Sequence, residues 1–186
     1  AVYGGSFGLK KNFVMAATVA AYLGVDRKFI VRTLKNFPGI KHRMELVAEN
    51  CGVHFYNDSA STNPQSSVAA ILAMTHPTIL IAGGKDKNLD YAPLAEALVS
   101  AAHVKHVILF GENKEKIAKS LSKNVRVDIV NNLNSALVIA HDSAKNLVAS
   151  GQSLVAVLFS PGSASFDMFK DYQDRGEQFK KIVKKL

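Results

Sequence analysis

Short apolar runs that alternate with helical segments are the feature that most constrains how this chain folds. The first two runs, at 44–48 and 53–56, flank the turn sequence Asn50-Cys51-Gly52, which is typical of a β-hairpin. Further strands are expected at 78–82, 106–110, 125–130 and 154–159, and helices at about 64–74, 92–102, 112–121, 133–149 and 166–185. Because parallel strands need helical crossovers, the pattern predicts a doubly wound, mostly parallel, Rossmann-like α/β sheet.

Residues 1–40 carry a different pattern, that of two helices. Small and apolar side chains recur at helical spacing up to Gly24, and Asp26 is placed to cap a second helix. A Pro-Gly pair opens the segment 38–43, which is therefore expected to be a hinge-like linker. The chain is expected to consist of an N-terminal helical segment, 1–40, and an α/β domain, 41–186.

Composition excludes several classes of protein. Hydrophobic residues make up 48% of the 186 and charged residues 20%, which argues for a packed core rather than disorder. No apolar run approaches the roughly 20 residues that span a bilayer, and the first residues lack the layout of a signal peptide. The single cysteine, Cys51, allows no internal disulfide. These features favour a cytoplasmic protein without a membrane span.

The net charge of +8 leaves two interpretations open: a nucleic-acid surface, or a basic protein that handles anionic substrates. One dense cluster closes the final helix, where cations complement the helix dipole: Lys180, Lys181, Lys184 and Lys185. A solvated face is the favoured interpretation, so no nucleic-acid partner is expected. Four histidines without metal-ligand spacing are expected to be structural, so no metal site is expected from them: His76, His103, His106 and His141.

Polar loops follow three of the expected strands, at the sheet edge where α/β proteins bind ligands. The first, 57–64, can hold an anion on backbone N–H groups and a helix N-terminus, or can merely cap that helix through Thr62 or Asn63. The second, 83–90, holds two glycines and two lysines; it is a site for a charged substrate or a flexible turn, and lacks Walker A spacing. The third, 160–167, precedes a helix whose N-terminus would complete a carboxylate or phosphate site.

Taken together, these segments resemble the C-terminal domain of the Mur ligase family, in particular its D-glutamate-adding ligases. The likeness covers essentially the whole chain, and its final motif is long and specific. The matching motifs, in family order, are Gly39-Ile40-Lys41-His42-Arg43-Met44-Glu45 (G-x-x-H-R-x-E); Asn57-Asp58-Ser59 with Thr62-Asn63-Pro64 (N-D-S-K-A-T-N); Gly83-Gly84 with Lys87 and Asp90 (G-G-x-x-K-x-x-D); and the closing signature Ser160-Pro161, Ala164-Ser165-Phe166-Asp167, Phe169-Lys170, Tyr172, Arg175-Gly176 and Phe179. By this resemblance, 1–40 is the helical end of the central ATP-binding domain and 41–186 is the C-terminal, amino-acid-binding domain.

The resemblance implies an ATP-dependent amide ligase of peptidoglycan synthesis. In the family, ATP with Mg²⁺ phosphorylates the carboxylate of UDP-MurNAc-L-alanine, and the amino group of D-glutamate attacks the acyl phosphate. This piece is expected to bind D-glutamate and to close on the nucleotide. The residues expected to bind are Thr62, Lys87, Ser165 and Tyr172 for the two carboxylates of D-glutamate, and Asn12, Arg43 and Asp58 for the nucleotide. The catalytic loop, the Mg²⁺ ligands and the UDP-binding domain are expected in the rest of a longer protein, so this piece alone is expected to be inactive.

Two departures from the family's motifs bear on the expected site. Ala60 stands where many members have a lysine, which removes a substrate cation that Lys85 or Lys87 would have to replace. Gly8 and Leu9 stand where the family has the His-Asn of its adenine-binding helix. Two alternatives remain open: a sister enzyme, such as another Mur ligase or a folylpolyglutamate synthase, and a non-catalytic module that binds a nucleotide or an amino acid.

Overall fold

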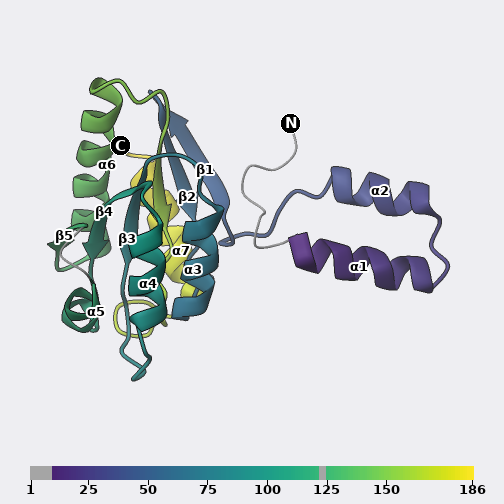
Figure 1. The fold of residues 1–186 in the computed structure, drawn as a ribbon, viewed down its shortest axis with the longest axis horizontal. Coiled ribbons are helices and arrows are strands. Elements are labelled where there is room, and N and C mark those ends of the chain that lie inside the picture. The colour runs from purple at the N-terminus through teal and green to yellow at the C-terminus, as the bar shows by residue number, and fades with distance from the viewer. Residues whose placement is uncertain (1–9, 122–124) are drawn as a thin grey trace.

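The computed structural model describes residues 10–121 and 125–186 (Figure 1). A six-stranded sheet lies at the centre of the α/β domain, in the order β1-β2-β6-β3-β4-β5. The strands are β1 Glu45–Asn50, β2 Val53–Asn57, β3 Thr78–Ala82, β4 Val104–Leu109, β5 Arg126–Ile129 and β6 Val155–Phe159. β1 pairs antiparallel with β2, and the remaining pairs are parallel. The predicted fold class is confirmed.

Helices cover both faces of the sheet. They are α3 Pro64–Ala73, α4 Ala92–Ser100, α5 Lys114–Ser120, α6 Leu133–Ala149 and α7 Tyr172–Val183, whereas α1 Lys10–Tyr22 and α2 Arg27–Lys35 belong to the N-terminal segment. In β3, Ile79 and Ile81 share a core with α6 and α7, whereas Leu80 shares the opposite core with α3, α4 and α5. A strand covered on both faces favours apolar side chains on both sides, which is why β6 is an unbroken apolar run and β3 is one after its first residue, Thr78. Within residues 10–121 and 125–186, no helix combines the length and the apolarity that a bilayer crossing requires.

The hairpin at the edge of the sheet forms as predicted. Cys51 and Gly52 connect β1 to β2, and both have left-handed backbone conformations, with φ values of 48° and 82°. Two consecutive positive φ values are typical of a two-residue turn whose twist matches that of the flanking strands. The turn therefore sets the register in which Asn50 pairs with Val53.

The last helix begins later than the sequence pattern predicted. Residues 166–171 form turns, and α7 starts at Tyr172. Asp171 decides this boundary, because its side chain accepts a hydrogen bond from Asp174 N at 2.8 Å and so caps the helix. The predicted start at 166 is wrong, and the loop after β6 is longer than expected. The other predicted boundaries in the α/β domain lie within two residues of those observed.

The N-terminal segment forms the predicted pair of helices, which extends to one side of the α/β domain (Figure 1). Asp26 caps α2 as predicted, by accepting a hydrogen bond from Lys28 N at 2.8 Å. Few apolar side chains of the N-terminal segment are covered. Those exposed by more than half are Val14, Met15, Val19, Tyr22, Leu23 and Phe29. Gly8 and Leu9, the departures from the adenine-binding motif, lie outside the described residues.

The linker between the helical pair and the sheet is fixed by contacts with the α/β domain. His42 and Met44 have φ values of 62° and 47°, which are uncommon for residues with side chains. His42 N donates to Glu45 Oε2 at 2.9 Å, and Met44 N donates to Asp58 Oδ1 at 3.2 Å. The buried ring of His42 packs directly against Gly176 in α7. The path of the linker therefore depends on the absence of a side chain at Gly176.

Replacing Gly176 with alanine is expected to destabilise the chain by about 1–3 kcal/mol, the usual range for overpacking. The added Cβ would lie 2.2 Å from Nδ1 of His42, and that ring nitrogen is held at 3.0 Å from Nδ2 of Asn57. Urea unfolding measures the loss. Gln173→Ala, at an exposed position of the same helix, is the matched control and should change stability by less than about 0.5 kcal/mol.

Combining His42→Ala with Gly176→Ala should recover part of the loss, because the side chain that obstructs the new methyl group is removed. If the two losses simply add in the double variant, the proposed clash does not cause the destabilisation.

Candidate functional site

The three polar loops meet at one edge of the sheet. β2, β6 and β3 are neighbours and run parallel, so their carboxyl ends lie side by side. Backbone hydrogen bonds join the loops directly: Gly162 N donates to Ser61 O at 3.0 Å, and Lys85 N donates to Ala164 O at 2.8 Å. The loops that the sequence analysis selected therefore form one connected cluster at the position where open α/β sheets bind ligands.

Asp58, the first charged residue after β2, is almost fully buried and extensively hydrogen bonded. Its Oδ2 accepts from the hydroxyl groups of Ser61 and Ser160, the latter at 2.7 Å, and its Oδ1 accepts from Met44 N at 3.2 Å. Burial raises the pKa of Asp58, and the two serine hydroxyls partly oppose that shift. The carboxylate thereby ties the linker to the loops after β2 and β6.

A cavity of about 400 Å³ lies beside Asp58. It extends from the linker to α3 and to the first turn of α1, and its lining residues are Asn12, Ile40, Arg43, Met44, Asp58, Ser61, Gln65, Ser66, Ala69 and Ala70. The structure thus brings the three residues expected to contact a nucleotide, which are far apart in the sequence, to the wall of a single cavity. Asn63 caps α3 through Ser66 N at 2.9 Å, so the N-terminal turn of that helix also faces the cavity.

The lysines of the loop after β3 have different environments. Lys85 Nζ lies 2.6 Å from Glu112 Oε2, and this contact raises its pKa. Lys87 instead lies over the ring of Phe166, 5.3 Å from its centroid, and no carboxylate in residues 10–121 or 125–186 pairs with it. Lys87 is therefore the lysine of this loop whose charge is available to a ligand.

The other expected substrate residues lie on the same joined loops or directly beside them. Thr62 is half-buried and Ser165 is 2% exposed. Tyr172 opens α7, and its carbonyl oxygen accepts a hydrogen bond from the hydroxyl of Ser59 at 2.8 Å. Ser165, however, does not precede a helix N-terminus, because α7 starts later and is capped by Asp171. The interpretation of this loop as an anion site completed by a helix N-terminus is therefore wrong.

Arg175 belongs to the closing motif of the sequence, but the motif alone assigned no role to it. The guanidinium is fully buried and donates three hydrogen bonds. Its Nε donates to Ser59 Oγ at 3.0 Å, and one terminal nitrogen donates to Ser59 O at 2.9 Å. The other terminal nitrogen donates to Ser163 O at 2.9 Å. Burial lowers the pKa of Arg175 to about 10, so it remains a cation at neutral pH. A signal was present, because Arg175 lies on the apolar stripe of α7 with Phe179 and Val183.

Asn113 was also missed, although it follows a strand in the same way as the three chosen loops. It lies just after β4 and is 1% exposed. Its side chain accepts from Gly84 N at 2.9 Å and donates to the hydroxyl groups of Tyr91 and Ser163. The position after a strand, at the sheet's carboxyl edge, is the signal that could have identified it.

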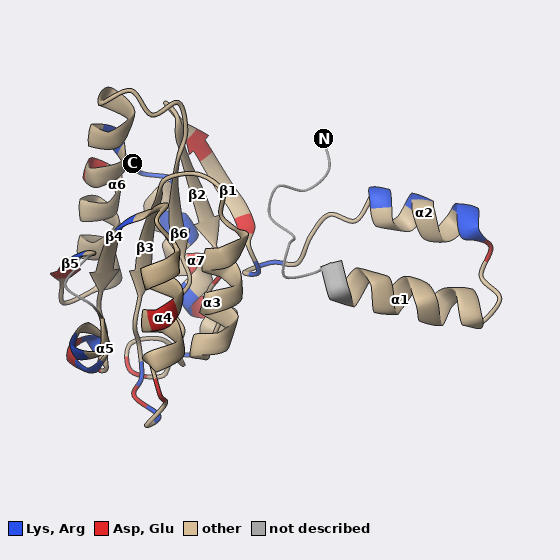
Figure 2. Cartoon of the chain, viewed as in Figure 1, with Lys and Arg blue, Asp and Glu red and all other residues tan. Residues whose placement is uncertain are grey.

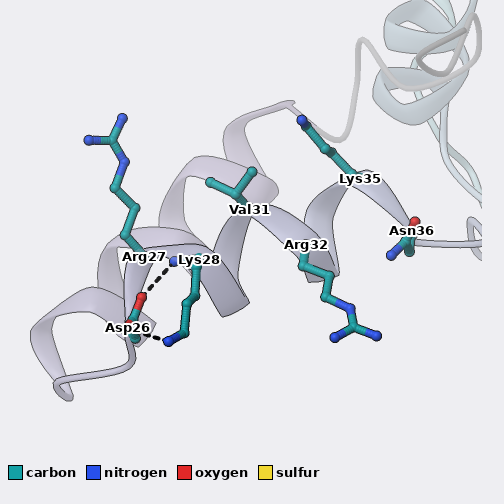
Figure 3. Close-up of a pocket in the computed structure, with 7 residues that line it drawn as sticks. All are labelled: Asp26, Arg27, Lys28, Val31, Arg32, Lys35 and Asn36. Atoms are coloured by element: carbon teal, nitrogen blue, oxygen red, sulfur yellow. Dashed lines mark hydrogen bonds and ion pairs between the residues drawn. The ribbon is translucent and has the colours of Figure 1, made fainter.

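A larger and more open hollow of about 650 Å³ lies on the helical pair, away from these loops (Figure 3). The charged residues of α2 are all basic (Figure 2), and all of them line the hollow: Arg27, Lys28, Arg32 and Lys35. The smaller cavity beside Asp58 is the better candidate, because buried polar groups and a helix N-terminus converge on it. In the described part of the chain, no cluster of three or more His, Cys, Asp or Glu side chains could hold a metal ion.

A family profile described as "Mur ligase, glutamate ligase domain" matches residues 42–157, more than half of the chain. The chain belongs to the Mur ligase family. The resemblance carried by the sequence motifs is thereby confirmed, and the matched region contains β1 to β5 and the loops after β2, β3 and β4.

Curated Mur ligase relatives are similar over nearly the whole chain. The UDP-N-acetylmuramoylalanine–D-glutamate ligase of Protochlamydia amoebophila is 43% identical over 176 residues, which cover 95% of this chain and 38% of the relative. The ligase of the same name from Pelodictyon phaeoclathratiforme is 39% identical over 175 residues, covering 94% and 36%. The chain therefore spans less than two-fifths of the length of these relatives.

Solved structures share the fold at low sequence identity. A pseudomurein peptide ligase type C from Methanothermus fervidus has a TM-score of 0.61 and 17% identity, covering 94% of this chain and 35% of that one. MurF from Acinetobacter baumannii has a TM-score of 0.60 and 17% identity, covering 91% and 37%. Folylpolyglutamate synthase from Mycobacterium tuberculosis also reaches 0.60, at 16% identity, covering 79% and 36%. The fold is thus common to several amide ligases.

The raised pKa of Asp58 predicts how an Asp58→Asn variant unfolds as pH changes. The folded state binds the proton of Asp58 more tightly than the unfolded state does, so the protonated carboxyl group stabilises the fold relative to the ionised one. This stabilisation is present below the unfolded pKa of about 3.9, and it is lost as pH rises through the higher pKa of the folded state. Thermal unfolding of Asp58→Asn should therefore match that of the unchanged chain at low pH and equal or exceed it at neutral pH. A variant that is less stable only at neutral pH would contradict this reasoning.

Asp86→Asn is the matched control, with the opposite sign. A hydrogen bond from Lys116 lowers the pKa of Asp86, so its contribution is present at neutral pH and is lost as pH falls through the folded value. This variant should therefore lose a little stability at neutral pH and none at low pH.

Proposed function

We propose that this chain is the C-terminal part of an ATP-dependent ligase that joins D-glutamate to UDP-MurNAc-L-alanine through an acyl phosphate, in peptidoglycan synthesis. One observation carries the proposal: a cavity lined by Asn12, Arg43 and Asp58 adjoins the joined loops that bear Thr62 and Lys87. The relatives that match nearly the whole chain have names that describe this activity. Because the chain spans less than two-fifths of them, the activity belongs to a longer protein.

The cavity fits the ribose and phosphates of ATP. Arg43 supplies a planar cation suited to phosphate oxygens, and Asp58 supplies an acceptor for ribose hydroxyl groups. The first turn of α3, with Gln65 and Ser66 on the cavity wall, presents the positive end of a helix dipole to an anion. Asn12 on α1 lies where it would contact the base from the opposite side.

The joined loops fit an amino acid with two carboxylates. Lys87 would supply an exposed cation, and Thr62 and Ser165 would supply hydroxyl donors on the neighbouring loops, with Tyr172 at the start of α7. The buried guanidinium of Arg175 lies behind the same loops and adds a fixed positive charge. A dianion needs such a combination of cations and neutral donors, because each carboxylate oxygen loses its water on binding.

This chain's part in the reaction would be to position the reactants. By holding both carboxylates of D-glutamate, the loops would direct its free amino group towards the acyl phosphate formed at the nucleotide site. Alignment of two reactants and stabilisation of charge supply most of the rate enhancement in phosphoryl-transfer chemistry. Mg²⁺ would be bound mainly by the rest of the protein, together with the phosphates of the nucleotide.

The helical pair, 1–40, would be the end of the central ATP-binding domain, and 41–186 the C-terminal domain. Large apolar side chains on α1, on α2 and just after α1 are exposed by more than half, and the rest of the central domain would cover them: Val14, Met15, Val19, Tyr22, Leu23 and Phe29. The partners of the chain are thus its own missing domains, D-glutamate and UDP-MurNAc-L-alanine. The cytoplasm, where ATP and the UDP-linked substrate are both present, is the proposed location.

A sister ligase with a different amino acid is the second candidate. Ala60 favours it, because this residue replaces a lysine that is common in D-glutamate-adding enzymes. The sister-ligase candidate is disfavoured by the closing motif at 160–179 and by the names of the relatives. A panel of D- and L-amino acids assayed with the full-length protein decides between the two, and a non-catalytic module would use none of them.

Lys87→Ala in the full-length protein is expected to raise the KM for D-glutamate at least about tenfold, equivalent to about 1.4 kcal/mol. The reason is that Lys87 is the lysine of its loop whose charge is not paired with a carboxylate. Initial rates at varied D-glutamate concentration measure the effect. Lys85→Ala is the matched control, and its KM should change by less than about twofold because Glu112 already engages that lysine. Equal effects of the two substitutions would reject the role given to Lys87.

The chain alone is expected not to turn over ATP, because its 186 residues contain no G-x-x-x-x-G-K-[ST] loop to hold the phosphates. Phosphate release is measured with ATP, D-glutamate and UDP-MurNAc-L-alanine, and the full-length protein serves as the positive control. Substrate-dependent release by the purified chain would overturn this expectation.

A further inference from the structure

Asn113 occupies an unusual position for a residue at the start of a helix. It stands at the N-cap of α5, where an asparagine side chain normally accepts a hydrogen bond from the helix backbone, yet here it makes no such bond. The side chain turns inward instead and is 1% exposed. A buried amide is retained only where its donors and acceptor find partners, so its interior contacts must replace those of the cap.

Those interior contacts close the loop that carries Lys87. Oδ1 of Asn113 accepts from Gly84 N at 2.9 Å, and the backbone N–H of Asn113 donates to Gly84 O at 3.1 Å. Nδ2 of Asn113 donates to the hydroxyl of Tyr91, which is 2% exposed at the start of α4. One side chain therefore holds both ends of the loop, Gly84 and Tyr91, with Lys87 between them.

The same side chain also holds the neighbouring loop. Nδ2 of Asn113 donates to Ser163 Oγ at 2.7 Å, and the hydroxyl of Tyr91 lies 3.1 Å from that oxygen. Gly84 is pressed against this loop, because a Cβ there would lie 2.3 Å from Ala164 O. Ser165 lies two residues beyond Ser163. The amide of Asn113 therefore links the loop of Lys87 to the loop of Ser165 through side chains, in addition to the backbone hydrogen bonds that Gly83 N and Lys85 N donate to Pro161 O and Ala164 O.

We infer that Asn113 is a positioning residue for the amino-acid site: it sets the separation between the Lys87 loop and the Ser165 loop, and thereby the spacing at which two carboxylates are recognised. This inference rests on the proposed function, since it assigns a further residue to the same site. Asn113 would act through the two loops rather than by contact with the ligand, and it is not among the residues that line the cavity of Asp58 and Arg43. Its loss should therefore affect the amino acid and spare the nucleotide.

The test uses the full-length ligase, with wild-type activity measured first on ATP, UDP-MurNAc-L-alanine and D-glutamate. Asn113→Leu keeps the branched shape of the side chain and removes all three side-chain hydrogen bonds. It should raise the KM for D-glutamate at least about tenfold while the KM for ATP stays within about twofold, since only the loop geometry changes. Asn113→Asp should restore most of the affinity, because its carboxyl group can accept from Gly84 N and from both hydroxyl groups.

Asn132→Ala is the matched control for a purely structural effect. Asn132 is also an N-cap asparagine, and its side chain accepts from Ser135 N at 2.8 Å, at α6 on the opposite face of the sheet. Replacement of Asn132 should lower the melting temperature without raising the KM for D-glutamate relative to the KM for ATP. If Asn113→Leu raises both KM values by the same factor, or leaves the KM for D-glutamate within about twofold of wild type, the inference is overturned.

Two milder variants keep the test decisive if Asn113→Leu does not fold. Tyr91→Phe and Ser163→Ala each remove one hydroxyl group from the network and leave its packing nearly intact. Each should raise the KM for D-glutamate about two- to fivefold, the effect of one net hydrogen bond, without changing the KM for ATP. No change in either variant would overturn the inference. Absence of D-glutamate-dependent activity in the wild type would instead reject the proposed function itself.

Discussion

A buried guanidinium holds the carboxyl edge of this sheet together. Arg175 has no exposed surface and donates three hydrogen bonds, two to Ser59 and one to Ser163. Removing a cation from water costs several kcal/mol, so the charge is tolerated because these oxygen atoms replace its hydration. The ring of Phe159, with its centroid 6.0 Å from the guanidinium carbon, adds a favourable contact. The loops after β2 and β6 cannot separate without leaving this charge unpaired in the interior.

The same turn of α7 also fixes the linker. Gly176 follows Arg175 directly, and its lack of a side chain admits the ring of His42. Glu45 completes the attachment, because its carboxylate accepts from His42 N, from Nδ2 of Asn57 and from Nζ of Lys180. The linker and the ligand loops are therefore positioned by adjacent residues of one helix. A displacement of α7 would therefore move the cavity beside Asp58 and the amino-acid loops together. The proposed nucleotide site and the proposed amino-acid site would keep the same relative position.

The sequence predicted the fold well because the sheet is built from local patterns. Buried strands, helical spacing and glycine turns each leave a signal within a few residues, and the observed boundaries follow them closely. The start of α7 was missed because the helix was expected to follow directly on the serine- and glycine-containing turn at 160–165, whereas residues 166–171 form further turns. Asp171, followed by Asp174 three residues later, was the local signal for the true start.

The candidate site could be located from the sequence, but its supporting contacts could not. Strand ends and glycine-rich loops identify which segments meet at the sheet edge, since that follows from parallel topology alone. The roles of Arg175 and Asn113 depend on what lies on the other side of a loop, at sequence separations of 116 residues to Ser59 and 50 residues to Ser163. A single sequence contains no record of such pairings. Burial decides them, and burial becomes apparent only in the folded chain.

Replacement of the expected lysine by Ala60 changes how the proposed site must work. Glu112 neutralises Lys85 and Asp86 pairs with Lys116, so the site retains one exposed cation, Lys87, and the buried charge of Arg175. Because Arg175 is buried, Lys87 alone could contact a carboxylate of the ligand directly, and the second carboxylate would depend on hydroxyl and backbone donors. Neutral donors act over short distances, so affinity then depends on loop spacing more than on net charge. A site of this kind requires rigid support, and the buried amide and guanidinium behind the loops supply it.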